Sequence, residues 1–187
     1  MEFPSEQLAA FQYAIDALET AGIDYVVTGA WVISAYGILR ATHDLDIVIA
    51  VQSVDPAKLV AAFPAPRYYA DEIWIAESLA GLSFFNIIDS ESTLKIDFWP
   101  LKNDDYSQEQ FRRRAPVMMG ERRVWALTAE DIILAKLLWI KISDSERQWQ
   151  DVRTVWALKK DELDMPYLNQ WATRLSIADL LAKATAA

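Results

Sequence analysis

Three aspartates in two short apolar segments could bind metal ions. Asp44 and Asp46 begin a segment, residues 44–51, whose β-branched residues are typical of a buried strand. Alternate side chains of a strand share one face, so the two carboxylates point the same way, opposite to Leu45 and Ile47. Carboxylates this close repel each other, and a divalent cation between them allows both to stay ionised. Because oxygen ligands suit Mg²⁺ and Mn²⁺, the pair predicts a metal site.

The third aspartate, Asp97, lies in the segment Lys-Ile-Asp-Phe-Trp at residues 95–99. Its neighbours Ile96 and Phe98 point the other way, which places Asp97 on the polar face of a second strand. Strands rarely contain aspartate, so Asp97, together with the upstream pair, favours a functional role. Two simpler interpretations stay open: a solvated strand end for the upstream pair, and a surface position on an edge strand for Asp97.

Two other residues could bind the phosphates of a nucleotide. Gly29 follows a strand-like segment and lets the backbone approach an anion, which amides at the next helix start would bind. Lys136 lies on a helix that is apolar nearly all round, so its ammonium needs an anion or a path to solvent. The anion could be a nucleoside triphosphate or the Asp151 carboxylate in a structural ion pair. Arg147 and Asp151 are four residues apart, where a surface ion pair is the simplest interpretation.

The net charge and the composition limit the kinds of ligand and metal site that this protein could have. The formal net charge of −9 argues against a nonspecific nucleic-acid coat, so nucleic acid is not a favoured partner. The absence of cysteine and the single histidine, His43, exclude disulfides, thiolate metal sites and multi-histidine zinc sites. One basic concentration could still draw a nucleic acid or triphosphate, although a solvated face is the commoner explanation; it contains Arg112, Arg113, Arg114, Arg122 and Arg123.

The ends of the chain and its apolar runs predict a cytoplasmic protein. The acidic N-terminus lacks the basic and apolar parts of a signal peptide. The most apolar run, Ile132 to Ile142, is too short to span a bilayer and contains two lysines. No membrane association is therefore expected.

The spacing of apolar residues and breakers predicts the elements that position these groups. Helices are expected at 5–21, 31–36, 56–63 and within 103–114, and strands at 24–28, 45–51, 73–76, 82–88, 94–99 and 122–127. From Thr128 the pattern becomes helical, with Thr128 and Asp131 as a start that is similar to a capping box and a second helix at 144–160. The sequence thus predicts an α+β fold with a mixed β-sheet flanked by helices. Residues 1–127 would form the core, and residues 128–187 a helical part packed on it.

The order of these motifs resembles the nucleotidyltransferase superfamily. There a Gly-Gly or Gly-Ser turn opens a helix, and an acidic pair follows at the start of the next strand. The matching residues here are Gly29-Ala30 and Asp44-Leu-Asp46. Ala30 departs from the serine form of the turn because it has no hydroxyl. The stretch Arg40-x-Thr42-x-Asp44-x-Asp46 is the most specific part of the likeness.

The resemblance continues downstream and covers about residues 23–155. This part is similar to AbiEii-type and minimal nucleotidyltransferase-like proteins. They share an acidic helix start, here within 127–137, a lysine on that helix, here Lys136, and an arginine and an aspartate on the next helix, here Arg147 and Asp151.

This resemblance implies transfer of a nucleoside monophosphate from a nucleoside triphosphate such as ATP to an acceptor, with release of pyrophosphate. The acceptor would be a hydroxyl or phosphate of a small molecule, an RNA end or a protein. Mg²⁺ or Mn²⁺ would lie at the three aspartates, and the nucleotide would contact Gly29, Ala30, Arg40, Thr42 and Lys136. Two alternatives are a metal-dependent phosphohydrolase and a non-catalytic member that binds a nucleotide or a partner, with an antitoxin-like or regulatory role. A homodimer and a cognate protein partner, as in toxin–antitoxin pairs, are both left open.

Overall fold

The computed structural model describes residues 5–36, 42–143 and 145–186. Its strands are β1 (Tyr25–Thr28), β2 (Asp44–Ile49), β3 (Tyr68–Tyr69), β4 (Phe85–Asp89), β5 (Lys95–Pro100), β6 (Ala115–Met119) and β7 (Arg122–Ala126). Its α-helices are α1 (Ser5–Thr20), α2 (Gly29–Ala35), α3 (Pro56–Ala61), α4 (Glu72–Ala80), α5 (Asp105–Arg112), α6 (Ala129–Ser143), α7 (Glu146–Lys159), α8 (Met165–Arg174) and α9 (Ala178–Thr185). A short 3₁₀ turn, η1 (Val51–Ser53), follows β2.

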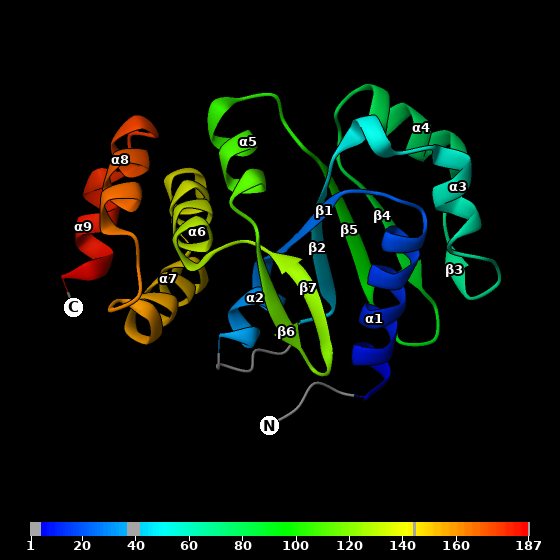
Figure 1. Cartoon of the computed structure of the whole chain (residues 1–187), viewed down its shortest axis with the longest axis horizontal. Coiled ribbons are helices and arrows are strands. Elements are labelled where there is room, and N and C mark those ends of the chain that lie inside the picture. Colours follow the sequence, from blue (N-terminus) through cyan, green and yellow to red (C-terminus); the bar gives the residue numbers. More distant parts are fainter. Residues whose placement is uncertain (1–4, 37–41, 144, 187) are drawn as a thin grey trace.

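The described strands form one sheet in the order β3-β4-β5-β2-β1-β7-β6. The pairs β2–β5 and β1–β7 are parallel, and the other neighbours are antiparallel. Figure 1 shows α1, α3 and α4 towards one end of the molecule and α6 to α9 gathered at the other, with the sheet between them. The predicted α+β fold, a mixed sheet flanked by helices with a helical C-terminal part, is confirmed.

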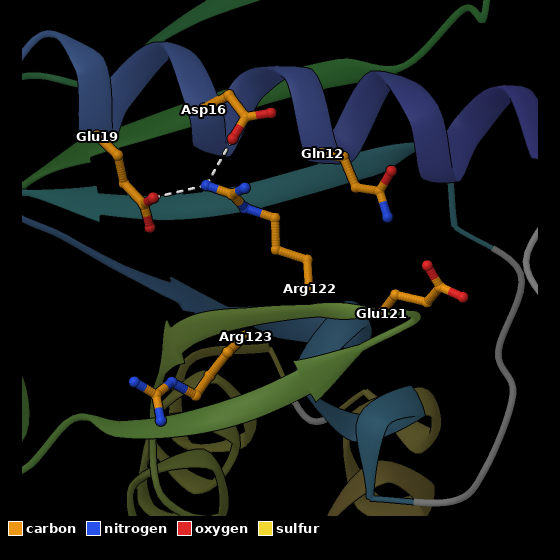
Figure 2. Close-up of a pocket in the computed structure, with 6 residues that line it drawn as sticks. All are labelled: Gln12, Asp16, Glu19, Glu121, Arg122 and Arg123. Atoms are coloured by element: carbon orange, nitrogen blue, oxygen red, sulfur yellow. Dashed lines mark hydrogen bonds and ion pairs between the residues drawn. The ribbon is translucent and has the colours of Figure 1, made fainter.

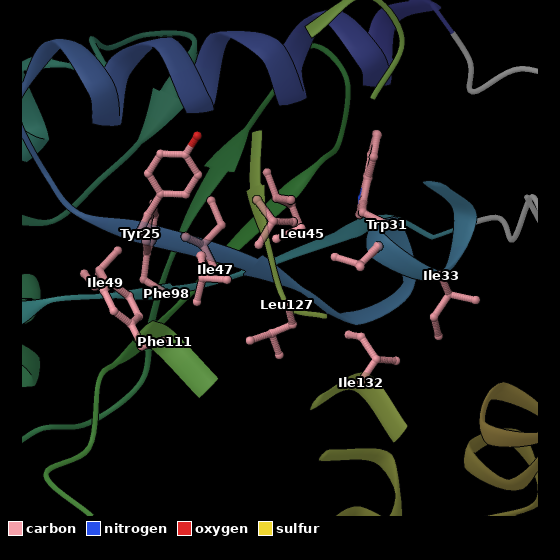
Figure 3. Close-up of a cluster of buried hydrophobic side chains, with 14 of the residues drawn as sticks. Tyr25, Trp31, Ile33, Leu45, Ile47, Ile49, Phe98, Phe111, Leu127 and Ile132 are labelled. Carbon is pink, nitrogen blue, oxygen red and sulfur yellow. The ribbon is translucent and has the colours of Figure 1, made fainter. Parts of the chain in front are cut away.

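Strand β2 has one apolar face and one polar face, as its alternation predicts. Leu45, Ile47 and Ile49 are fully buried in the hydrophobic core. The same core contains Phe98 of β5, and Figure 3 shows these side chains clustered beneath α1. The core face fixes the register of both strands, because a one-residue slip would bury the polar face instead.

The predicted strand at 73–76 is wrong, because these residues belong to α4. The Asp71 carboxylate accepts a hydrogen bond from the Trp74 amide at 2.9 Å, which caps the start of this helix. Ile75 and Leu79, four residues apart, are its buried apolar positions. The strand expected from residue 82 begins only at Phe85, after Leu82 adopts a left-handed backbone conformation. Strands β3 and β6 were missed by the sequence analysis.

The helical C-terminal part begins as predicted. Thr128 Oγ1 accepts a hydrogen bond from the Asp131 amide at 3.3 Å and donates one to Asp131 Oδ2 at 3.0 Å. Asp131 is fully buried, and Tyr167 of α8 donates a hydrogen bond to it at 2.7 Å. These contacts tie α8 to the start of α6. In the part of the chain that the structure describes, no helix is both long and apolar enough to cross a membrane.

Candidate active site

The sheet brings the three predicted aspartates onto one face of two neighbouring strands. In the parallel β2–β5 pair, Asp46 lies opposite Asp97 and Asp44 lies opposite Lys95. On the other side of β2, Thr28 of β1 lies opposite Asp46. The polar faces predicted separately for the two strands are therefore one continuous surface.

Gly29 connects β1 to α2 directly against Asp46. Its φ is +73°, a left-handed backbone conformation that residues with a side chain rarely adopt. A β-carbon at this position would overlap Oδ2 of Asp46 and would lie 3.0 Å from its Cγ. The turn thus requires glycine for two reasons, backbone conformation and space.

Three other residues were predicted to contact the nucleotide near this turn and the start of β2. The Ala30 methyl group is buried, so it faces the protein interior. The Thr42 hydroxyl donates to the Asp44 carbonyl and accepts from the Asp44 amide, both at 3.2 Å, and so shapes the start of β2. Arg40 lies outside the described residues.

A lysine that the sequence analysis did not assign to the site lies between two of the carboxylates. Lys95 Nζ is 3.1 Å from Asp97 Oδ2 and 3.6 Å from Asp44 Oδ1. Burial acts to lower the Lys95 pKa, but the hydrogen bond and charge of Asp97 and the charge of Asp44 raise it overall. The ammonium therefore stays protonated and partly neutralises the site. The alternation at 95–99 contained the signal, since Lys95 and Asp97 share a face.

Asp97 holds its proton unusually tightly. Burial raises its pKa to about 6; Lys95 opposes this, and the charges of Asp46 and Asp44 add to it. Only 6% of the residue is exposed, and its Oδ1 is buried without a hydrogen-bond partner among the described residues. Burial also raises the Asp46 pKa, although Trp99 Nε1 donates a hydrogen bond to its Oδ1 at 3.4 Å.

This donor set fits a hard divalent cation in its chemistry. Burial raises the pKa of Asp46 and of Asp97, and Oδ1 of Asp97 has no hydrogen-bond partner among the described residues. A divalent cation would stabilise the ionised form of both carboxylates. As they stand, however, no three acidic or histidine side chains within the described ranges are arranged to hold a metal ion. The Lys95 ammonium occupies the space beside Asp44 and Asp97 instead.

Lys136 makes the structural pairing that the sequence left open. Its Nζ lies 2.9 Å from Asp151 Oδ2, and both side chains are largely buried. The prediction that Arg147 and Asp151 form a surface ion pair is wrong about the position of Asp151. This carboxylate is buried, and it pairs with Lys136. Lys136 is also close enough to Asp46 for its charge to lower the pKa of that carboxyl.

The basic concentration is neutralised by acidic partners at most of its positions. Arg122 contacts Asp16 and Glu19 of α1, as Figure 2 shows, and Arg113 lies within 4.0 Å of three carboxylates. Arg112 pairs with Glu109 and Arg114 with Asp24. These pairs support the interpretation of a charge-balanced surface over a nucleic-acid site.

Two surface hollows lie away from the aspartates. One of about 460 Å³ is lined by Gln12, Asp16, Glu19, Glu121, Arg122 and Arg123 (Figure 2). The other, of about 630 Å³, lies between α5 and α8 and is lined in part by Asp105, Arg112 and Arg174. Neither carries an arrangement of groups suited to the chemistry expected of the aspartates.

Comparison with solved structures identifies the fold. The antibiotic-resistance factor ANT(2″)-Ia aligns with a TM-score of 0.55 over 91% of this chain and 96% of its own, at 14% identity. The lincosamide adenylyltransferase LnuA, solved with lincomycin bound, aligns with a TM-score of 0.57 over 84% and 99%, at 15% identity. This chain has the nucleotidyltransferase fold.

A third nucleotidyltransferase-like structure agrees. An antigenic nucleotidyltransferase-like protein from Paracoccidioides brasiliensis aligns with a TM-score of 0.52 over 100% of this chain and 95% of its own, at 15% identity. No family model and no curated protein matches the sequence. The nucleotidyltransferase fold is thus shown by structure, and the AbiEii-type subgroup stays a prediction.

Proposed function

We propose that this protein is a metal-dependent nucleotidyltransferase. The observation that carries the proposal is the pairing of Asp46 with Asp97 across β2 and β5, beside a glycine turn that contacts Asp46. The nucleotidyltransferase fold supports it independently. Asp44, Asp46 and Asp97 would hold Mg²⁺ or Mn²⁺, which when bound would neutralise the triphosphate and ease deprotonation of the acceptor.

The chain's own residues would then have separate roles. An acceptor oxygen would form a bond to the α-phosphorus while the bond from that phosphorus to the bridging oxygen breaks and pyrophosphate leaves. The acceptor's proton would pass to Asp97 Oδ1, which lacks a hydrogen-bond partner within the described residues. The Gly29 and Ala30 amides would face the terminal phosphates, and the Lys136 charge would reach the nucleotide from beside Asp46.

A small molecule is the first acceptor class to test. ANT(2″)-Ia has been solved in complex with adenylyl-2″-tobramycin and LnuA with lincomycin, so both accommodate small molecules. In this chain most of the basic concentration is already paired with acids, which disfavours an RNA end. A hydroxyl of a small molecule therefore comes before RNA and protein acceptors.

A second candidate is a non-catalytic member that binds a nucleotide or a partner protein. The buried Ala30 methyl and the pairing of Lys136 with Asp151 favour it, because both remove direct contacts to a triphosphate. The complete set of three aspartates favours the enzyme instead.

Calorimetric titration of each nucleoside triphosphate separates these functions. We expect wild type to bind one or more triphosphates only when Mg²⁺ is present, and Asp46→Asn to bind at least tenfold more weakly. Asp105→Asn, which changes an exposed aspartate on α5, is the matched control and should bind like wild type. Binding that ignores both Mg²⁺ and Asp46 would contradict the proposed site.

A further inference from the structure

Lys95 is built into the carboxylate site by the strands themselves. It faces Asp44 across the β2–β5 pair and lies two residues before Asp97 on the same face of β5. Its ammonium contacts both carboxylates, at 3.6 Å and 3.1 Å. The Asp97 side chain is only 9% exposed, whereas that of Lys95 is 38% exposed, so the lysine reaches inward from the solvent side.

The ammonium and a metal ion need the same oxygens. Mg²⁺ binds oxygen at about 2.1 Å and demands nearly octahedral geometry, which leaves no room for a second cation against the same carboxylate edge. Two positive charges at that separation also repel strongly in a partly buried site. A metal ion held by Asp44 and Asp97 would therefore displace the Lys95 ammonium from between them.

The ammonium also lies beside an aromatic ring in its present position. The Phe84 ring centroid lies 6.0 Å from Lys95 Nζ, within the range of a cation–π contact. Phe84 packs against Trp99, with ring centroids 4.7 Å apart, so this aromatic surface is held in place. A modest rotation of the flexible lysine stem would move the charge from the carboxylates towards this ring.

We infer that Lys95 is a tethered counter-ion that competes with the metal ion for Asp44 and Asp97 and leaves them when the metal binds. The inference rests on the proposed function, since it concerns the metal of that site. The protein without metal keeps its carboxylates compensated by Lys95. With metal, the ammonium moves towards Phe84 and solvent.

Metal affinity tests the inference without any need for substrate. Free Mn²⁺ is measured by electron paramagnetic resonance during titration of wild type, Lys95→Met and Lys95→Gln in the absence of nucleotide. Removal of the competing charge should tighten Mn²⁺ binding roughly tenfold in both variants. Lys58→Met removes a lysine that pairs with Asp55 at the start of α3, and it should bind like wild type.

The outcomes separate this inference from the proposed function. Equal or weaker Mn²⁺ binding by both Lys95 variants, with wild type binding normally, overturns the role of Lys95 and leaves the proposed function standing. If neither wild type nor variants bind Mn²⁺, the proposed metal site and this inference both fail.

A measurement on wild type avoids dependence on how the variants fold. Lysine acetylation followed by mass spectrometry reports how accessible each amine is, with and without saturating Mg²⁺. Lys95 labelling should rise several-fold with Mg²⁺, while Lys58 labelling stays constant. Unchanged Lys95 labelling at a Mg²⁺ concentration that displaces bound Mn²⁺ from the site would overturn the inference.

Discussion

Gly29 lies so close to Asp46 that the carboxylate occupies the space a β-carbon would need. The turn between β1 and α2 thus lies against the acidic pair of β2, although fourteen residues separate Gly29 from Asp44 in sequence, five of them outside the described ranges. This contact and the left-handed backbone explain why the turn begins with glycine.

Gly29→Ala should therefore damage both stability and activity. The alanine would adopt an unfavourable left-handed backbone and push the Asp46 carboxylate away, for a loss of about 2–4 kcal/mol in the free energy of unfolding. Gly22→Ala is a matched control, because Gly22 has a similar φ of +69° but open space around its α-carbon. It should lose only about 1 kcal/mol. Urea unfolding of the two variants measures the difference, and equal losses would contradict the close approach.

Asp97→Asn should abolish nucleotidyl transfer and yet stabilise the metal-free protein at pH 7. The raised pKa of Asp97 means that its ionised form is destabilised by burial, and the neutral amide removes this cost. We expect a gain of about 1–2 kcal/mol in the free energy of unfolding. Thermal unfolding in a chelator checks the stability, with Asp105→Asn as control. A lower melting temperature for Asp97→Asn would show that its contact with Lys95 outweighs the burial cost.

The contribution of Asp97 to the stability of the metal-free protein should fall as the pH rises from about 4 to about 6. The pKa of Asp97 is about 6 in the folded protein against an ordinary 3.8, so the folded protein binds this proton more tightly than the unfolded chain. The protonated Asp97 carboxyl therefore contributes its full stabilisation of the folded state below pH 3.8, and this contribution disappears as the pH rises through 6. Asp131, with a buried carboxyl and a pKa of about 6, acts in the same direction. Melting temperatures across this range measure the slope. Asp97→Asn should reduce it, and an unchanged slope would exclude Asp97 as its source.

Lys136→Met should destabilise the packing of α6 against α7. The substitution removes the ammonium that lies 2.9 Å from the buried Asp151 carboxylate, at a cost of about 3 kcal/mol. The double variant Lys136→Met/Asp151→Leu should recover most of this loss, because it also removes the buried negative charge. Lys159→Met, which breaks a pair with the exposed Glu162, should change stability by less than about 1 kcal/mol. Chemical unfolding of the three proteins provides the comparison.

The polar and apolar faces of β2 and β5 could be predicted from sequence, because period-two alternation is a local property. That Asp46 lies opposite Asp97 could not be predicted, since the register of parallel strands distant in sequence depends on the whole core. The strand at 73–76 failed for a different reason. Four apolar or small residues fit a strand or a buried helix equally well, and the Asp71 cap decided between them.

The charges of the site were harder to predict than its shape. Lys136 could bind a triphosphate or an acid equally well from sequence, because the choice depends on how α7 packs beside α6. Lys95 was visible on the same face as Asp97, but its second contact, with Asp44, arises only from strand pairing.

Transfer of label from an α-phosphate-labelled nucleoside triphosphate tests directly whether the protein is a nucleotidyltransferase. The assay combines wild type or Asp97→Asn with Mg²⁺, the triphosphate that binds in calorimetry, and a panel of hydroxyl-bearing small molecules. Wild type should give a labelled acceptor and stoichiometric pyrophosphate, and Asp97→Asn should be at least a hundredfold slower. Equal rates for the two proteins, or release of inorganic phosphate in place of pyrophosphate, would contradict the proposed function.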